Sequence, residues 1–285
     1  MTDSYVALFL NSSLATNPLG ALSLFFLFLA RMLPIIQSAA FLGSRVLANP
    51  VKVAFAISLF VIYLPQLFSG IATPLQFNFL LLIYMVKELF IGMILGHIIS
   101  LPFIIAQSAG IFIDHQRGGS SLMVNDPTVQ NQSSPLGTLF NMTLIYLFYV
   151  IGGPWDFFNA ISISYELIPP DQFITSGFFS QDGLVMGQMV KLLNQIMVMA
   201  TQLATPALIA ILMTDSFLGI ANRLAPQVQI TFLGMPLKSL LGLTIVCLGW
   251  RLLTKQMVTH SHYWLDHIVE IIYMFDVYGG SRLSG

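Results

Sequence analysis

Side chains that could carry chemistry are few in this 285-residue chain, since only 8% of its residues are Asp, Glu, Lys or Arg. His260, His262, Asp266 and His267 stand close together near the C-terminus, and their nitrogen and oxygen atoms are typical metal ligands. No second group of ligands completes a site, and His-rich and aromatic stretches beside membrane segments are typical of interfacial anchoring. We therefore predict no metal and no other cofactor.

The sequence also shows no pattern of nucleophile, base and orienting group. Lys87 and Glu88 are neighbours, so on a helix they point in different directions and we expect them not to pair. The string Gly118–Ser121 has neither the lysine of a phosphate-binding loop nor the spacing of a nucleophile elbow. We do not expect an enzyme.

The composition is that of a membrane protein. Hydrophobic residues reach 56%, and the 8% of charged residues compares with about 25% in soluble domains. The formal net charge of -1 leaves too little basic surface for nucleic acid. With Cys247 as the single cysteine, an internal disulfide is excluded. We expect one continuous helical domain over residues 1–255 and an amphipathic cytoplasmic tail over 256–285.

Apolar runs long enough to cross a bilayer recur along the chain, because a crossing helix needs about 20 residues. We predict main helical segments at 19–42, 52–68, 77–105, 136–151, 184–213 and 231–253, then an amphipathic helix at Trp264–Tyr278. Prolines interrupt four of these segments, and broken helices at membrane depth are tolerated against protein or around a cavity. The fold class is therefore an all-α membrane protein with irregular helical hairpins and broken helices.

Basic residues mark the expected cytoplasmic side. Arg45 and Lys52 lie in one short connection, Arg251 and Lys255 begin the tail, and the acidic connection 156–182 has no basic residue. Six simple crossings would place the two basic regions on opposite sides of the membrane. We therefore predict that at least one segment is re-entrant or buried in protein, and that the C-terminus is cytoplasmic.

Several charged residues lie within or beside the apolar runs, where facing lipid would be unfavourable. We expect these residues to face partner subunits: Arg31, Lys87, Glu88, Lys191, Arg223 and Lys238. The alternative is that some of them lie near helix ends and extend to water.

A polar block over Ala109–Phe140 separates two apolar helices and is longer than usual helix connections. Disorder is one interpretation. An ordered functional loop is favoured because apolar residues alternate with charged ones. Arg117 is expected to bond Asp114 and Asp126, while Gly118 and Gly119 allow the chain to fold back.

At this block the sequence resembles a known family. Gly110 to Gly118, then Asn125-Asp126-Pro127 and Ser134-Pro135-Leu136-Gly137, resemble the type III secretion export apparatus T protein, whose flagellar homologue is the R protein. A second block agrees, with Leu203 to Pro206, Asp215 to Gly219, Asn222 to Gln227 and Gly234 to Leu243. His115 and Gln229 depart from the usual pattern, which leaves partner contacts at these two positions open.

The resemblance implies a structural subunit of an export gate in the bacterial inner membrane, part of it above the lipid plane. Its implied partners are the R and S export proteins, the autocleaving switch protein, the large export-gate protein, unfolded secreted polypeptides and membrane lipid. It also implies a loop that plugs the channel, formed here by Gln116, Arg117, Gly118, Gly119, Ser120, Ser121, Leu122, Met123, Val124, Asn125 and Asp126.

The Asp-x-Gln-Arg-Gly pattern favours the virulence injectisome branch, with flagellar export as the alternative. A stand-alone secondary transporter is a second alternative, because broken helices and intramembrane charges also mark transporters.

Overall fold

The computed structural model describes residues 18–44, 46–70, 77–118, 134–172, 184–224 and 230–259, together with 261 and 264. Every regular element in these ranges is a helix, which confirms the all-α prediction. The elements are α2 (Pro18–Ser38), η1 (Ala40–Leu42), α3 (Asn49–Gly70), α4 (Phe79–Gln116), α5 (Pro135–Val150), α6 (Gly153–Leu167), α7 (Leu184–Leu224) and α8 (Ile230–Leu248). A further helix covers Trp250–Thr259.

Length and composition make several of these helices able to cross a membrane. Four qualify individually within the described ranges, namely Leu19–Ser38, Asn49–Phe68, Phe79–Gln116 and Lys191–Leu224. The pairs α5 with α6, and the end of α8 with Trp250–Thr259, qualify only when each bent pair counts as one span. The chain is a multi-pass membrane protein. Its bends lie between Val150 and Gly153 and between Leu248 and Trp250. The prolines that were expected to interrupt helices lie inside α2, α4, α7 and α8 instead, at positions 34, 102, 206 and 236.

Two of the predicted segments end too early, and one helix was not predicted. Helix α7 continues to Leu224, past the expected end at 213. Helix α4 continues to Gln116, past the expected end at 105, because Ala109 and Ile113 are fully buried and continue its packed face. Helix α6 lies in a stretch that we expected to be an acidic connection. Its apolar residues recur at helical spacing and form a buried face: Phe157, Ala160, Ile161 and Tyr165. The predicted helix Trp264–Tyr278 lies outside the described residues, except for Trp264.

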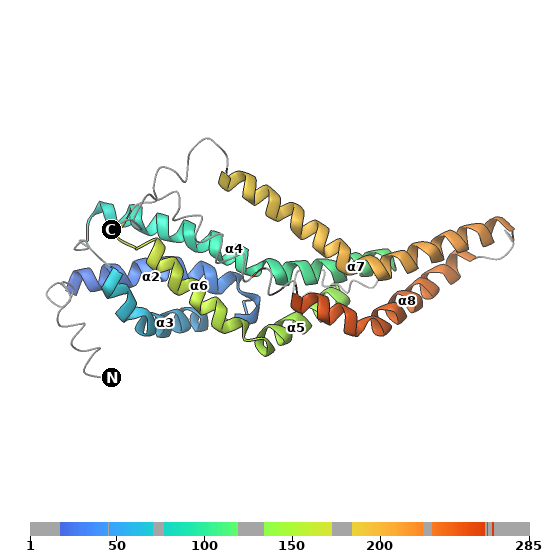
Figure 1. Ribbon diagram of the computed structural model, residues 1–285, viewed down its shortest axis with the longest axis horizontal. Coiled ribbons are helices and arrows are strands. Elements are labelled where there is room, and N and C mark those ends of the chain that lie inside the picture. Colours follow the sequence, from blue (N-terminus) through green and yellow to red (C-terminus); the bar gives the residue numbers. More distant parts are fainter. Residues whose placement is uncertain are drawn as a thin grey trace. The chain divides into compact units, whose positions relative to one another are not determined.

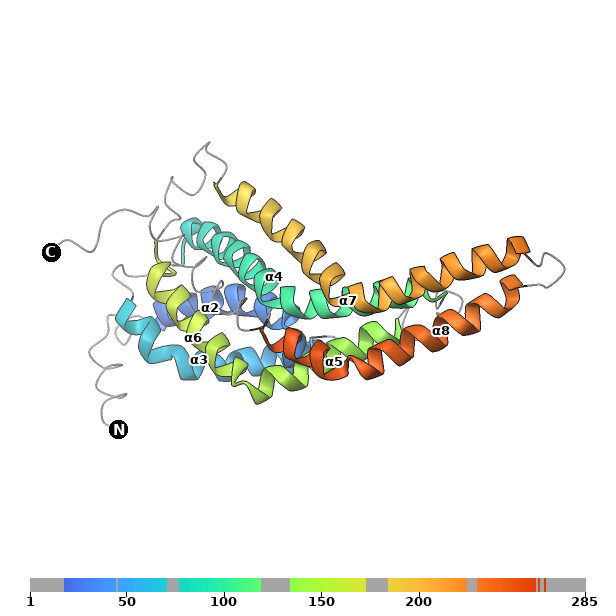
Figure 2. The same cartoon turned by 45° about the vertical axis from the view of Figure 1, so that its right-hand side comes forward.

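The chain divides into two compact units. Unit 1 comprises residues 1–100, 152–186 and 263–285. Helices α2, α3 and α6 lie side by side within it (Figures 1 and 2). Its core is aromatic: the Phe28 ring stacks on Tyr165 with centroids 5.6 Å apart and meets Phe60 edge-on at 5.4 Å. The Tyr63 hydroxyl donates to the Phe158 carbonyl oxygen at 2.8 Å and ties α3 to α6.

Unit 2 comprises residues 101–151 and 187–262. The C-terminal part of α4 packs closely on α5, because a Cβ added at Gly110 would lie 2.5 Å from the Gly137 Cα atom. Helices α7 and α8 run beside each other as a hairpin (Figure 2). Phe140 of α5 contacts Trp250, with ring centroids 6.2 Å apart.

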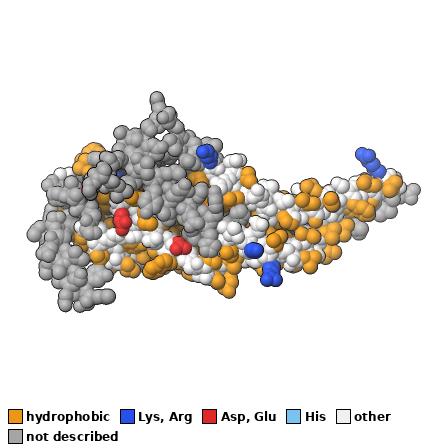
Figure 3. Space-filling view, viewed as in Figure 1, with side chains coloured by type: hydrophobic (Ala, Val, Ile, Leu, Met, Phe, Trp, Pro, Cys, Tyr) orange, Lys and Arg blue, Asp and Glu red, His pale blue; other side chains and the backbone are white. Residues whose placement is uncertain are grey.

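Large apolar side chains remain exposed along the α7–α8 hairpin, where Figure 3 shows them gathered on the visible face. Phe217, Leu224 and Leu248 are 68%, 81% and 79% exposed. Surfaces of this kind in a membrane protein are suited to lipid or to the helices of partner subunits.

Candidate functional site

The first candidate site is a buried charge cluster in unit 1, centred on Arg31 of α2. Arg31 and Glu88 are both 0% exposed. The Arg31 Nε atom donates to Glu88 Oε2, and its second terminal nitrogen donates to Oε1 at 2.9 Å. This two-point contact matches the planar guanidinium to the carboxylate, a geometry that lysine cannot reproduce. The guanidinium also lies 4.1 Å from the centre of the Tyr165 ring.

Lys87 belongs to the same cluster, and our expectation that Lys87 and Glu88 do not pair is wrong. The Lys87 ammonium lies 2.7 Å from Glu88 Oε1. Neighbouring side chains leave a helix about 100° apart. The long lysine stem nevertheless brings its nitrogen back to a carboxylate that Arg31 holds in place. Asp171 adds a second negative charge that acts on Lys87, so the formal charges of the four residues sum to zero.

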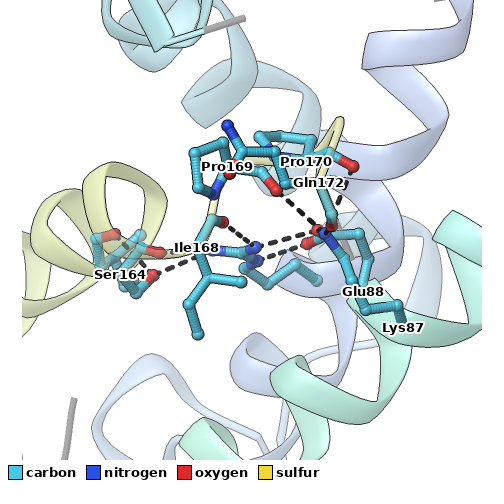
Figure 4. Close-up of polar contacts among 9 residues, drawn as sticks. Lys87, Glu88, Ser164, Ile168, Pro169, Pro170 and Gln172 are labelled. Atoms are coloured by element: carbon cyan, nitrogen blue, oxygen red, sulfur yellow. Dashed lines mark hydrogen bonds and ion pairs between the residues drawn. The ribbon is translucent and has the colours of Figure 1, made fainter. Parts of the chain in front are cut away.

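The remaining acceptors come from the C-terminal end of α6 and the chain that follows it (Figure 4). Arg31 donates to the carbonyl oxygens of Ser164 at 2.9 Å and Ile168 at 2.7 Å. Lys87 donates to those of Pro169 at 2.9 Å and Gln172 at 2.8 Å. The last carbonyls of a helix lack internal partners and carry partial negative charge. Arg31 therefore binds carbonyl oxygens at the end of α6, and Lys87 binds those of the chain just beyond it, while the last turn of α6 has no basic residue of its own.

Glycines in α4 allow the helices of this cluster to approach. A Cβ at Gly92 would overlap the Arg31 carbonyl oxygen, and one at Gly96 would lie 3.0 Å from the Pro34 carbonyl oxygen. Gly92 and Gly96 are one turn apart, the small-residue spacing that brings membrane helices into close contact. Arg31 and Lys87 are thus bonded to groups of this chain, whereas the sequence predicted that they face neighbouring subunits.

The second candidate site lies at the base of the polar loop in unit 2, and we call it the clasp: Asp114, Arg117, Ser134 and Leu136. Asp114 is 1% exposed and accepts from Arg117 Nε at 2.7 Å. Its other oxygen accepts from the Ser134 hydroxyl and from the Leu136 backbone N–H at 2.9 Å. The prediction of an Arg117–Asp114 contact is confirmed.

Ser134 fits its place in the clasp because it is the N-cap of α5. Its Oγ atom accepts from the Gly137 N–H at 2.9 Å, and Pro135 follows at the first helical position. The pattern Ser-Pro-x-Gly is an N-cap signal that could have identified this residue from the sequence. One buried carboxylate therefore bonds Arg117 and Ser134, the residues on either side of segment 118–133.

The rest of the predicted plug is only partly described. Gln116 is exposed at the end of α4, and Gly118 follows with φ +86°, a conformation that glycine adopts without strain. The predicted residues from Gly119 to Asp126 lie outside the described residues, so the Arg117–Asp126 contact stays a prediction.

The other predicted charges are not gathered with the cluster. Lys191 and Arg223 are exposed on α7. Lys238 of α8 is half-buried and forms an ion pair with Asp215 of α7, which the sequence analysis did not identify. Within the described ranges no group of three His, Cys, Asp or Glu side chains is placed to hold a metal ion, and His260, His262, Asp266 and His267 lie outside those ranges.

These observations define a multi-pass helical membrane protein with internal charge networks. A family model described as bacterial export proteins, family 1, matches residues 22–262. The chain is 30% identical over 186 residues to the Yop proteins translocation protein T of Yersinia pestis, a match covering 64% of this chain and 67% of that protein.

Two further relatives match more of the chain. It is 28% identical over 224 residues to the secretion system apparatus protein SsaT of Salmonella typhimurium, covering 78% of this chain and 82% of that protein. It is 28% identical over 232 residues to the flagellar biosynthetic protein FliR of Bacillus subtilis, covering 78% of this chain and 87% of that protein. The chain belongs to the family of bacterial export proteins, family 1, and is an export apparatus protein of the type III secretion and flagellar kind.

Proposed function

We propose that this chain is a structural subunit of the type III export gate in the bacterial inner membrane, and that residues Gln116 to Asp126 plug its channel. Unfolded polypeptides would pass through the gate when the plug moves aside. The chain itself would do no chemistry. The sequence Asp114-His-Gln116-Arg117-Gly118 favours the injectisome branch over the flagellar one.

The clasp is the observation that carries this proposal. Asp114 bonds the end of α4 and the start of α5 at once, so the segment between them leaves and returns at one buried point. A plug needs such fixed ends, because a free strand could not block a channel repeatedly at the same place. Charge-assisted hydrogen bonds are strong where water is scarce, which suits a clasp inside a membrane complex.

Assembly with the R and S export proteins, the autocleaving switch protein and the large export-gate protein fits the surface of the chain. The exposed apolar side chains of α7 and α8 would pack against partner helices or lipid. Lys191 and Arg223 are exposed in this chain, so partner subunits are left to supply their counter-charges. Four spans and one of the two bent pairs give five crossings, which would place both basic regions in the cytoplasm.

Deleting Gly118 to Val124 tests the plug. The gate should still assemble, since the helices form the contacts, but cells that express it should admit small solutes and ions faster than cells with the intact gate. Influx of a small dye or potassium efflux measures the leak. Co-purification of the R and S proteins with the shortened chain checks assembly.

A matched control shortens a different connection, by deleting residues 72–74 between α3 and α4. That gate should assemble without the same leak. If the deletion of Gly118 to Val124 assembles and leaks no more than the intact gate, the loop is not the barrier. Substrate-dependent transport by the purified chain alone would favour the secondary transporter.

A further inference from the structure

Helix α8 presents one stripe of residues to the base of the polar loop. The Ser239 hydroxyl accepts from a terminal nitrogen of Arg117 at 3.0 Å. A Cβ added at Gly242 would lie 4.0 Å from the Arg117 Cβ, and one added at Gly118 would lie 3.8 Å from the Met235 Cγ. Positions 235, 239 and 242 are four and three residues apart, so they share one face of the helix.

The same stretch of α8 also holds α7. Lys238 forms an ion pair with Asp215, and a Cβ added at Gly242 would lie 3.1 Å from the Ile211 Cδ1 atom. Ile211 and Asp215 are one turn apart on α7 and face the same way. Residues 238 to 242 therefore touch both the hairpin partner α7 and the end of α4.

Arg117 divides its donors between the two contacts. Nε and one terminal nitrogen face Asp114, each at 2.7 Å, while the other terminal nitrogen faces Ser239. Arg117 is 8% exposed, so a donor that loses its acceptor gains little water in return. An unsatisfied buried donor on a charged group is strongly unfavourable. Displacing α8 from Arg117 would thus destabilise the clasp. Loosening the clasp would destabilise the contact of α8 with Arg117 by the same free energy.

We propose that Ser239 is a positioning residue that couples the α7–α8 hairpin to the clasp. A partner that displaces the hairpin would thereby loosen the Arg117 end of the loop. This inference rests on the proposed plug function of the loop. The α7–α8 hairpin would be the element that controls the plug.

Ser239→Ala in the assembled gate tests the coupling. The small-solute leak should rise about tenfold or more, the ratio that corresponds to one hydrogen bond to a charged group. Ser239→Thr keeps the hydroxyl and should restore a tight gate. Thr244→Ala is the matched control on the same helix, because the Thr244 hydroxyl is exposed and bonds its own helix, at the Leu240 carbonyl oxygen. Equal leaks for Ser239→Ala and Thr244→Ala, with normal assembly, would overturn the proposal.

A double-mutant comparison separates this proposal from the plug itself. Ser239→Ala should add nothing to the leak of Arg117→Ala, since the contact is already absent. Additive leaks would overturn the coupling. If the Gly118 to Val124 deletion leaks but Ser239→Ala does not, the plug stands and the coupling fails. If that deletion does not leak, while the two substitutions affect thermal stability of the gate non-additively, the coupling stands as a structural contact and the plug fails.

Discussion

Replacing Arg31 by Ala removes the centre of the buried charge cluster in unit 1. Among the described residues Glu88 would keep the Lys87 contact, the Ile168 carbonyl oxygen would lose its Arg31 donor, and the Ser164 carbonyl oxygen would keep the Ile168 N–H alone. Breaking a buried ion pair by removing one partner destabilises a protein by about 3–5 kcal/mol. Loss of the Tyr165 ring contact adds about 0.5–2 kcal/mol. We expect a loss at or above the upper end of the first range.

Two further variants identify the source of that loss. Arg31→Lys keeps the charge but not the two-point geometry, and should lose about 1.5–3 kcal/mol. Arg31→Met with Glu88→Met removes both charges, so it should be less destabilised than the sum of the two single variants. Lys255→Ala is the control, because Lys255 is exposed and its loss should stay within about 0.5 kcal/mol.

The assay is chemical denaturation of the detergent-solubilised gate, with all variants, including single Arg31→Met and Glu88→Met, compared at one protein concentration. The expected order of stability is Lys255→Ala, then Arg31→Lys, then Arg31→Ala. If Arg31→Ala is as stable as Lys255→Ala, the cluster does not hold α2, α4 and α6 together. Additive losses in the double variant would show that Arg31 and Glu88 act independently.

Two other predictions concern packing and topology. Gly110→Ala should destabilise the gate by about 1–3 kcal/mol, because its Cβ would overlap Gly137 of α5. Gly219→Ala has open space around its Cβ and should be neutral or slightly stabilising. Thermal melting compares the two variants, and equal effects would refute the close packing of α4 on α5. With Cys247 replaced by Ser, cysteines at the exposed positions 46 and 255 should both react with a membrane-impermeant reagent only from the cytoplasmic side, and periplasmic labelling at 255 would refute the five-span topology.

Apolar runs predicted the main helices because a bilayer imposes a minimum helix length. Helix α6 was missed since Asp156 and Glu166 make its stretch resemble a polar connection, although its buried face repeats at helical spacing. The continuation of α4 was missed because Gly110 and Asp114 look like loop residues. Their partners, Gly137 and Ser134, are visible only once α5 is in place.

For the charge cluster, too, the sequence predicted the residues but not their partners. The sequence identified Arg31, Lys87 and Glu88 as residues that must avoid lipid, and their burial agrees. It could not identify their partners, since the carbonyl oxygens that receive Arg31 lie 133 and 137 residues away and belong to a helix end that was not expected. Every residue type has a backbone carbonyl, so the sequence does not show which carbonyl oxygens a buried cation will bind.

The most direct test of the proposed function is an experimental density map of the closed gate, assembled from this chain with the R and S export proteins. We predict that residues 116 to 126 lie across the channel and that Asp114 contacts Arg117 and Ser134 beneath them. Density that places this segment on the outer surface of the gate, with the channel closed by another subunit, would contradict the proposal.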